Sequence, residues 1–495
     1  MRGGTLRLRW AALACGALLA AACLVCALCW NAIFDAFIAS QLRLVPGSTT
    51  FENWRQSDVV MYQDVYMFNW TNADRFPEEK PHLEELGPYR YREYRKQVNI
   101  SLTPSNDTVG YRTLKWWRYE PAPGTTTSLD DNVTMINVIA ASAAYRSRYW
   151  GYLRQKGLSM GLTMFGQRIS VSRPVRELLF EGYEDPLLDL AKSLPASATG
   201  GAPQVDKFGL FYGRNYSFEE DGYHEVTGGK YGLPGQILKW NGKDHLPFYE
   251  GKCSKLEGSV GGFYPRDLTQ GSHLRMFISQ LCRSVELRHD GSGYVDGVPY
   301  NKFAFYEGTF DNSSSRPENA CFCNGPCAWA GIMNVSSCSF GSPAFLSLPH
   351  FLHGAAALRR AVSGLRPDPA RHEFYFNIEP KLGVPVEVAG RFQFNVYIES
   401  SENIMLYNDV PRMLFPVFWV EQRFQMSAAD LAEIRSARAT AEWGGVLCAV
   451  VAAVCAAAVA AAAACMRRQE NAASRAAREK QDEAAVKLNP AKDFQ

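Results

Sequence analysis

The stretch "AALACGALLAAACLVCALC", Ala11–Cys29, contains no charged residue and is flanked by Trp10 and Trp30. Its length approaches the roughly 20 apolar residues that cross a bilayer, and tryptophan is enriched at both membrane interfaces. A cleaved signal peptide is the alternative, but the apolar part of such a peptide usually has only about 7–15 residues. The sequence therefore predicts a transmembrane helix over residues 10–30, after a short N-terminal segment, residues 1–9.

A second uncharged run, "GGVLCAVVAAVCAAAVAAAAACM", covers Gly444–Met466 and is rich in alanine. Arg467 and Arg468 follow it at once, as a stop-transfer flank should, and three arginines precede the first run. The polar tail, residues 467–495, argues against a GPI signal, because such a signal ends in its apolar segment. Both termini are therefore predicted to be cytosolic, and residues 31–443 to form one extracellular domain.

The glycosylation signals agree with this topology. All the Asn-x-Ser/Thr sequons lie between the two apolar runs, as expected for a domain outside the cytosol. The net charge of +2, with no basic patch interleaved with aromatic residues, indicates no nucleic-acid partner. The candidate glycosylation sites are Asn69, Asn99, Asn106, Asn132, Asn215, Asn312 and Asn334.

Cysteine usage gives a second argument about the compartment. An even number of cysteines in an extracytosolic domain favours disulfides, and six cysteines allow 15 pairings that spacing alone cannot separate. Zinc is the alternative for Cys323 and Cys327, but no second ligand pair follows at zinc-finger spacing, so neither a metal nor another cofactor is predicted. Cys465, near the cytosolic end of the second run, is a candidate for palmitoylation. The cysteines between the runs are Cys253, Cys282, Cys321, Cys323, Cys327 and Cys338.

The region between the two runs is predicted to be mainly β-structure, with a helical segment in its first half. In "RFQFNVYIE", Arg391–Glu399, apolar and polar residues alternate with the period of two that is typical of a strand. Helical patterns cluster over about 135–192 and break at Gly182 and Pro186. A last helix is expected to begin at Ser427, a plausible N-cap, and to run into the second apolar segment.

Three motifs resemble catalytic or metal-binding sites. "GLSMG", Gly157–Gly161, matches the nucleophile elbow of α/β hydrolases, but the residues on both sides of Ser159 look helical, whereas the elbow needs a preceding strand. "HFLH", His350–His353, lacks the glutamate and spacing of a zincin. "DGSGYVDG", Asp290–Gly297, departs from the EF-hand pattern and is better interpreted as a glycine-rich turn. No catalytic residue is predicted, and the protein is not expected to be an enzyme.

Several longer segments between the two apolar runs are distinctive when taken together. They are "MFNWTNADRF" (Met67–Phe76), "LGPYRYRE" (Leu86–Glu93), "RELLFEGYEDPLLDL" (Arg176–Leu190), "KFGLFYGRNYS" (Lys207–Ser217), "IEPKLGVPVEVAGRFQFNVYI" (Ile378–Ile398) and "SFGSPAFLSLPHFLH" (Ser339–His353), the last of which follows the cysteine cluster. With these segments the chain resembles the class B scavenger receptor family, and the resemblance covers nearly the whole chain and both apolar runs. That family includes the fatty-acid translocase and HDL receptor of vertebrates, a lysosomal integral membrane protein, and the insect croquemort and sensory neuron membrane proteins.

The resemblance implies a membrane-anchored α+β fold. A large antiparallel β-barrel-like ectodomain with a helical cap, about residues 135–192, is flanked by two transmembrane helices, and an apolar tunnel runs through it toward the bilayer. The family's ligand contacts lie in the cap, where Lys156 is a candidate contact and an ordinary solvated lysine is the alternative. The implied disulfides are Cys253–Cys321, Cys282–Cys338 and Cys323–Cys327.

The leading functional hypothesis is a scavenger-type receptor that binds hydrophobic ligands and transfers them to the membrane through the tunnel. The ligands would be fatty acids, sterols, carotenoids, lipid pheromones or lipoprotein lipids, and the partners are these ligands and the bilayer. The alternative is a phagocytic or pattern-recognition receptor for apoptotic cells, microbes or modified lipoproteins, and a third hypothesis is an ecto-enzyme that uses Ser159. The tail lacks the acidic dileucine signal of the lysosomal relative, which favours the plasma membrane. Homo-oligomerisation is left open.

Overall fold

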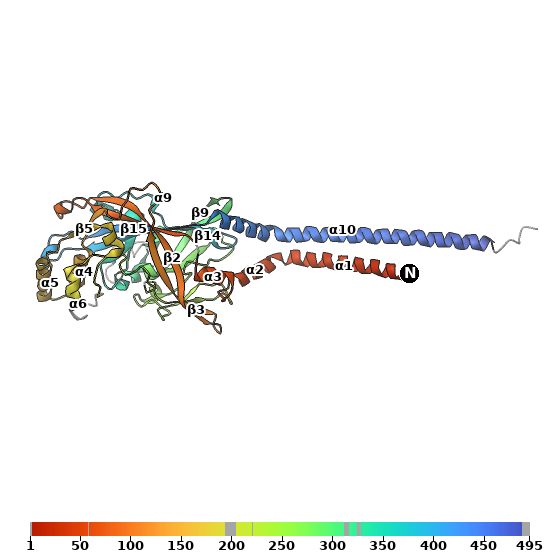
Figure 1. Cartoon of the computed structure of the whole chain (residues 1–495), viewed down its shortest axis with the longest axis horizontal. Coiled ribbons are helices and arrows are strands. Elements are labelled where there is room, and N and C mark those ends of the chain that lie inside the picture. Colours follow the sequence, from red (N-terminus) through yellow and green to blue (C-terminus); the bar gives the residue numbers. More distant parts are fainter. Residues whose placement is uncertain are drawn as a thin grey trace, which may run out of the picture. The chain divides into compact units, whose positions relative to one another are not determined.

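The computed structural model describes residues 2–57, 59–193, 204–219, 221–310, 316–323, 327 and 329–487. The chain divides into two compact units (Figure 1). The helical unit consists of Met1–Ser40 and Ala432–Gln495, and the larger unit is Gln41–Leu431.

The helical unit contains α1 (Arg2–Leu28), α2 (Trp30–Gln41) and most of α10 (Ala428–Lys487). α1 and α10 are both long and apolar enough to cross a membrane. The second predicted span lies within α10, whereas the first, residues 10–30, covers α1 up to Leu28 and extends to Trp30 at the start of α2. α10 begins where the sequence predicts, because the Ser427 hydroxyl accepts a hydrogen bond from the Asp430 amide at 3.2 Å.

Trp30, the first residue of α2, contacts α10. The Trp30 indole Nε1 donates to the Thr440 carbonyl at 3.2 Å. A Cβ added at Gly444 would lie 2.0 Å from the same indole, so only glycine allows this close approach. Further along, a Cβ at Gly16 would meet the Val459 side chain at 2.6 Å. Small residues therefore let the two long helices pack closely, as they do in membrane helix pairs.

One antiparallel sheet forms the frame of the larger unit. Its strands follow the order β7-β6-β3-β2-β1-β15-β14-β13-β10-β9-β8, β12 also pairs with β14, β11 pairs with β12, and β4 and β5 form a separate pair. The strands are β1 (Met61–Trp70), β2 (Leu83–Thr103), β3 (Thr108–Tyr119), β4 (Asn132–Ile136), β5 (Ser170–Pro174), β6 (His224–Thr227), β7 (Ile237–Trp240), β8 (His273–Ile278), β9 (Arg283–Val295), β10 (Val298–Ala304), β11 (Ile332–Asn334), β12 (Ala344–Ser347), β13 (Tyr375–Glu379), β14 (Val384–Ile398) and β15 (Met413–Gln425).

A short segment closes the sheet. The Ile237 amide on β7 donates to the Gly258 carbonyl at 2.9 Å, and the Phe277 amide on β8 donates to the Ser259 carbonyl at 2.8 Å. Both edge strands are thus joined through Gly258–Ser259. Gly258 has a φ of +97°, and a Cβ there would lie 2.4 Å from the Arg275 backbone, so this junction requires glycine. The sheet is therefore barrel-like, as the resemblance implied.

A closed sheet has an inner and an outer wall, and Lys115 on β3 identifies the inner one. Its Nζ lies 2.6 Å from Asp221, whose carboxylate also accepts from Gln280 at 2.7 Å, just beyond β8. Lys115 therefore faces the space between distant strands. Alternation and strand register then assign the neighbouring positions. The inner wall includes Gln63, Val65, Met67, Tyr91, Glu93, Arg95, Lys115, Trp117, Phe392, Phe394, Phe418, Val420 and Gln422, and the outer wall includes Asp64, Tyr66, Arg90, Arg391, Gln393, Asn395, Trp419 and Glu421.

β14 is buried on both faces, although its alternating sequence is typical of a half-buried strand. Gln393 and Asn395 on the outer wall are fully buried, whereas Phe392 and Phe394 on the inner wall are half-buried. The Asn395 amide donates to the Ser347 hydroxyl at 3.0 Å, and Gln393 accepts from the His350 amide at 2.6 Å. These bonds allow covering segments to bury polar side chains.

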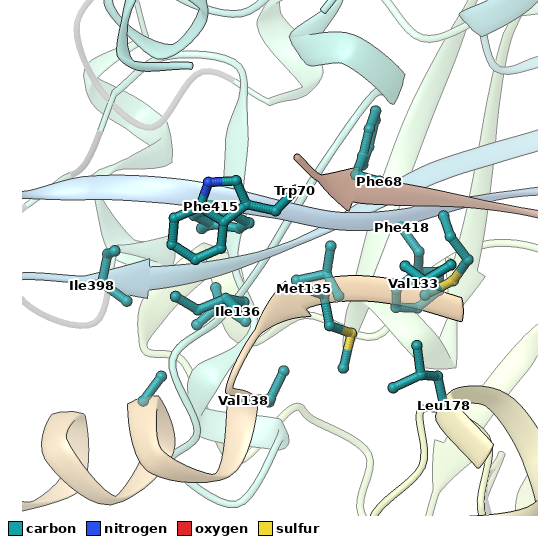
Figure 2. Close-up of a cluster of buried hydrophobic side chains, with 14 of the residues drawn as sticks. Phe68, Trp70, Val133, Met135, Ile136, Val138, Leu178, Ile398, Phe415 and Phe418 are labelled. Carbon is teal, nitrogen blue, oxygen red and sulfur yellow. The ribbon is translucent and has the colours of Figure 1, made fainter. Parts of the chain in front are cut away.

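Helices gather at one end of the larger unit and form the cap (Figure 1). Within the region predicted to be helical, Ser170–Pro174 is instead strand β5, paired with β4. β4 is a strand because Val133, Met135 and Ile136 are fully buried against the sheet, where Figure 2 shows them below Phe415 and Phe418. The other α-helices among the described residues are α3 (Thr49–Arg55), α4 (Val138–Ser147), α5 (Tyr152–Met164), α6 (Pro186–Ser193), α8 (Ala356–Ala361) and α9 (Pro369–His372), and η2 (Glu177–Glu181) is a π-helical turn.

The helix breaks predicted in the cap are confirmed. η2 ends at Gly182, which has a φ of +72°, and α6 begins at Pro186, whose fixed φ suits the first turn of a helix. At the start of α4, the Asn137 side chain accepts from the Ala140 amide at 3.0 Å and caps the helix.

Candidate ligand-binding surfaces

The first candidate surface is the exposed face of α5. Leu153, Met160 and Met164 recur at helical spacing and are 83%, 66% and 75% exposed, while Gln155 and Leu162 on the opposite face are buried. Gly157 lies between the exposed residues, and a Cβ added there would meet nothing within 4 Å. Apolar side chains on the outward face of a helix expose surface that a ligand or partner could cover.

Lys156 lies beside this apolar stripe. Its Nζ donates to the Glu402 carbonyl at 3.2 Å and lies 5.6 Å from the centre of the Tyr152 ring. The side chain remains exposed, so its ammonium can meet a negatively charged group at the edge of the stripe. The resemblance pointed to this region, but the apolar stripe itself was not recognised in the sequence.

The second candidate surface is the aromatic part of the inner wall. Ring centres run from Trp117 to Phe180 (5.7 Å), Phe211 (5.3 Å), Phe418 (5.7 Å) and Phe394 (5.5 Å). Phe180 and Phe211 come from the cap side of the chain, and the other three from β3, β15 and β14. A continuous apolar lining therefore extends from the cap into the sheet.

Parts of this lining are not fully packed. Phe392, Phe394 and Val420 are only half-buried although they face the inside of a closed sheet. These side chains therefore leave apolar area on the inner wall that no neighbouring side chain covers.

Comparison with known proteins identifies the family. The sequence profile of the CD36 family matches residues 14–466. The chain belongs to the CD36 family. It is 35% identical to Protein peste of Drosophila melanogaster over 81% of this chain and 73% of that protein. It is 32% identical to scavenger receptor class B member 1 of Rattus norvegicus (87% and 84% covered) and 29% identical to lysosome membrane protein 2 of Homo sapiens (81% and 82% covered). The chain is thus a class B scavenger receptor and a two-span membrane protein.

In this CD36-family chain three disulfides lie in the larger unit. They join Cys253 to Cys321, Cys282 to Cys338, and Cys323 to Cys327, the same pairs that the resemblance implied. The first two close long loops of the chain, with sequence separations of 68 and 56, and the third closes a separation of only 4. Cys465 on α10 is a free, exposed thiol.

The sequons differ in how accessible their side chains are. Asn99, Asn106, Asn132 and Asn215 are exposed. Asn69 and Asn334 are half-buried, and the Asn334 amide nitrogen, to which a glycan would be attached, donates to the Cys323 carbonyl at 3.1 Å. Asn312 lies outside the described residues.

A cluster on the outer wall has donor atoms suited to a metal. Candidate ligand atoms of Glu85, His350 and His372 lie within 4.8 Å of one another, and the two imidazole rings stack with centres 4.3 Å apart. However, the Nδ1 atoms of both histidines accept backbone hydrogen bonds, from Arg366 at 3.0 Å and Asp368 at 2.9 Å. In the neutral rings the protons therefore sit on Nε2, the nitrogen that would have to bind a metal. The chemistry fits a hydrogen-bonded cluster rather than a metal centre.

The electrostatics of this cluster follow from its burial and bonds. Burial alone would raise the pKa of Glu85, but hydrogen bonds from His350 (2.5 Å), Trp419 (3.0 Å) and Arg371 (2.9 Å) outweigh it and lower the pKa to about 2. Burial lowers the pKa of His372 to about 4. The sequence singled out His350 and His353 together, but His353 is exposed, and the ring next to His350 belongs to His372.

The other motifs have structural explanations. Ser159 lies within α5, not after a strand, and its hydroxyl accepts from the Met405 amide at 3.0 Å.

A surface pocket of about 450 Å³ is lined by Arg75, Glu79, Lys80 and His82 among others, so its charged lining does not suit apolar cargo.

Proposed function

We propose that this CD36-family chain is a cell-surface receptor that takes up hydrophobic lipids at its cap and passes them through the sheet interior to the membrane. The carrying observation is the half-buried apolar inner wall of a closed sheet. An exposed lipid chain in water costs about 0.8 kcal/mol for each CH₂ group. An apolar interior removes that cost along the path, and no chemical reaction is needed.

A bulky side chain introduced on the inner wall tests this proposal. Gly390 faces the inner wall opposite Gln422, and a Cβ there would contact its nearest neighbours at an ordinary 3.6–3.7 Å. We expect Gly390→Trp to fill the interior and to abolish uptake of labelled fatty acid and sterol by cells that express the full chain. Gln425→Trp places the same ring on the outer face of β15, where it is exposed, and is the matched control. Equal uptake by both variants at equal surface levels would contradict the proposal.

The proposed topology places the larger unit outside the cell, both termini in the cytosol and the protein in the plasma membrane. Glycans would then be found at the exposed sequons. Replacing Asn99 by Gln should remove the mass of one glycosidase-sensitive glycan. Replacing Asn334 by Gln should lower the mass of only a fraction of the molecules, because its amide is already bonded to the Cys323 carbonyl and should be glycosylated incompletely. Glycans at none of the sequons, or no protein labelled by surface biotinylation, would contradict this placement.

The exposed stripe on α5 favours a second function, recognition of particles such as apoptotic cells, microbes or modified lipoproteins. Introducing charge with Leu153→Asp and Met160→Asp should then abolish particle capture while uptake of free lipid survives. Loss of both activities would indicate that the stripe serves only as the entrance for lipid. The same assay addresses Lys156, because Lys156→Met should weaken capture of anionic ligands more than of neutral ones.

We further propose that the protein acts without enzymatic chemistry. Ser159→Ala removes the one hydroxyl in the elbow-like motif and only a helix-to-loop hydrogen bond. Uptake and capture should therefore be unchanged, and a measurable loss of either with normal surface expression would reopen the ecto-enzyme hypothesis.

A further inference from the structure

A polar cluster lies on the inner wall between apolar regions. It consists of Gln63 on β1, Glu93 and Arg95 on β2, Lys115 on β3 and Gln422 on β15. Strand register places these residues on the same face as the aromatic lining. We call this set the inner polar cluster. Its position inside an otherwise apolar wall requires an explanation, because polar groups without partners are costly to bury.

The carboxylates in and beside the cluster each have hydrogen-bond or ion-pair partners. Glu93 is almost completely buried and accepts from Arg95 Nη2 at 2.7 Å and from Gln422 Nε2 at 2.6 Å. Lys115 pairs with the carboxylate of Asp221 at 2.6 Å. Counted together with Asp221, the two cations are balanced by two carboxylates.

The donors are not all used. Gln63 is 8% exposed and its Oε1 accepts from the Trp117 indole at 3.1 Å, but its Nε2 has no hydrogen-bond partner among the described residues. Arg95 Nε is likewise buried without an acceptor in that part of the chain. Because both unpaired donors are buried atoms, an acceptor oxygen from outside the protein would first meet the exposed part of the Arg95 side chain beside them.

The Arg95 side chain also has room beside it. It remains 32% exposed although it faces the interior, and Gln422 on the neighbouring strand is half-buried. Apolar side chains continue from the cluster along the same wall toward Phe392 and Phe394. A molecule with an oxygen-bearing end and a long apolar body would match both features at once.

We infer that the inner polar cluster binds the oxygen-bearing head group of an amphipathic lipid while the lipid's chain lies along the aromatic wall. This inference rests on the proposed function and adds the chemical class of cargo that stops inside the barrel. A carboxylate would pair with Arg95, and a hydroxyl or ester oxygen would accept from the same donors without the charge.

The test uses the purified full chain in nanodiscs, with palmitic acid, hexadecanol and methyl palmitate as probes. Arg95→Met removes the guanidinium, while Glu93 keeps its bond from Gln422. We expect palmitic acid to bind about ten- to a hundredfold more weakly, the size of one hydrogen bond to a charged group, and the ester to change less. Arg95→Lys should restore part of the preference for the acid.

The matched control is Arg92→Met, which removes an arginine of the same strand on the opposite, outer face. It should leave all three affinities unchanged. If Arg95→Met does not fold, Gln63→Met tests the other unpaired donor and should weaken binding of the acid and the alcohol.

The outcomes separate the two proposals. Unchanged palmitic acid binding in both cluster variants, or an equal loss for the acid and the ester in a folded Arg95→Met protein, would overturn the inference and leave a purely structural cluster. Failure of the unmodified protein to bind any of the three lipids would instead overturn the proposed function.

Discussion

The outer and inner walls of the sheet carry two polar networks on the same strands, and the two are built differently. On the outer wall Arg90 donates from two nitrogens to Asp64, at 2.7 and 2.6 Å. Arg391 donates from two nitrogens to Glu421, at 3.0 and 2.6 Å, and its third nitrogen bonds the Glu373 carbonyl at 2.8 Å. On the inner wall Arg95 uses one nitrogen for Glu93 and keeps a buried one unpaired.

The difference indicates separate purposes for the two walls. Forked pairs satisfy the fixed geometry of the guanidinium and hold neighbouring strands together, so the Arg90 and Arg391 pairs are complete within the protein. On the same wall, one buried donor outside these pairs, the Nε2 of His372, has no partner among the described residues. The inner cluster leaves two buried donors, the Gln63 amide and the Arg95 Nε, without a partner among the described residues. A network that serves stability alone would be expected to use its donors, and one that serves a ligand would keep some free.

The largest effect is expected when the outer network is broken. Glu421→Ala leaves Arg391, whose side chain is only 9% exposed, without its counterion. Removing one partner of a buried pair costs about 3–5 kcal/mol, and we expect a loss of that size in the free energy of unfolding of the purified chain, measured by denaturant.

Two comparisons sharpen this prediction. The double variant Arg391→Met/Glu421→Leu should be less destabilised than Glu421→Ala, because it leaves no uncompensated charge. Asp267→Asn, at an exposed pair with Lys381, should cost below about 1 kcal/mol. Equal costs for the buried and the exposed pair would show that the outer network is not a stabilising frame.

A smaller effect is expected from pH at the outer histidine cluster. His372 is fully buried, its pKa is lowered to about 4, and Glu85, Asp368, Arg371 and His350 are the charged or titratable groups that act on it. Between pH 6.5 and about 4 the unfolded chain binds a proton at this residue that the folded chain does not. Stability is therefore fully present above pH 6.5 and falls as the pH is lowered, by about 2–3 kcal/mol over this window.

His372→Asn tests the assignment, because its side-chain oxygen can still accept from the Asp368 amide. The variant should lose most of the pH dependence between 6.5 and 4 in denaturant unfolding. An unchanged slope would assign the acid sensitivity to another group.

The sequence predicted the parts of this molecule that depend on local pattern. The apolar runs, the cap at Ser427 and the breaks at Gly182 and Pro186 each depend on neighbouring residues, and period-two alternation predicted β14. Burial of Gln393 depends on a segment more than 40 residues away, so alternation could not reveal it.

The candidate sites were harder to predict, for the same reason. The stripe on α5 could have been found from the spacing of Leu153, Met160 and Met164, although apolar residues on a helix more often face a core. The inner polar cluster combines four strands and depends on their register, which alternation within one strand does not contain. His372 likewise becomes a neighbour of His350 only in the folded chain.

The smallest effect is expected at the inner wall, and it bears most directly on the comparison. Gln422→Leu removes the 2.6 Å bond to Glu93 at nearly constant volume. Burial raises the pKa of Glu93, but the charges of Arg95 and Lys115, with hydrogen bonds from Arg95 and Gln422, lower it below its usual range. The two charges remain in place in this variant. We therefore expect a loss of only about 1–2 kcal/mol in the free energy of unfolding, since a neutral donor is lost and no charge is left unpaired.

Gln425→Leu, at an exposed outer position of the same strand, should stay within about 0.5 kcal/mol and serves as the control. A cost at Gln422 as large as that at Glu421 would mean that the inner cluster is as closed and as structural as the outer network. The unpaired donors of Gln63 and Arg95 would then be a packing consequence rather than a place kept for a ligand. A small cost at Gln422 together with altered lipid binding would instead indicate that the outer network stabilises the barrel and that the inner cluster binds its cargo.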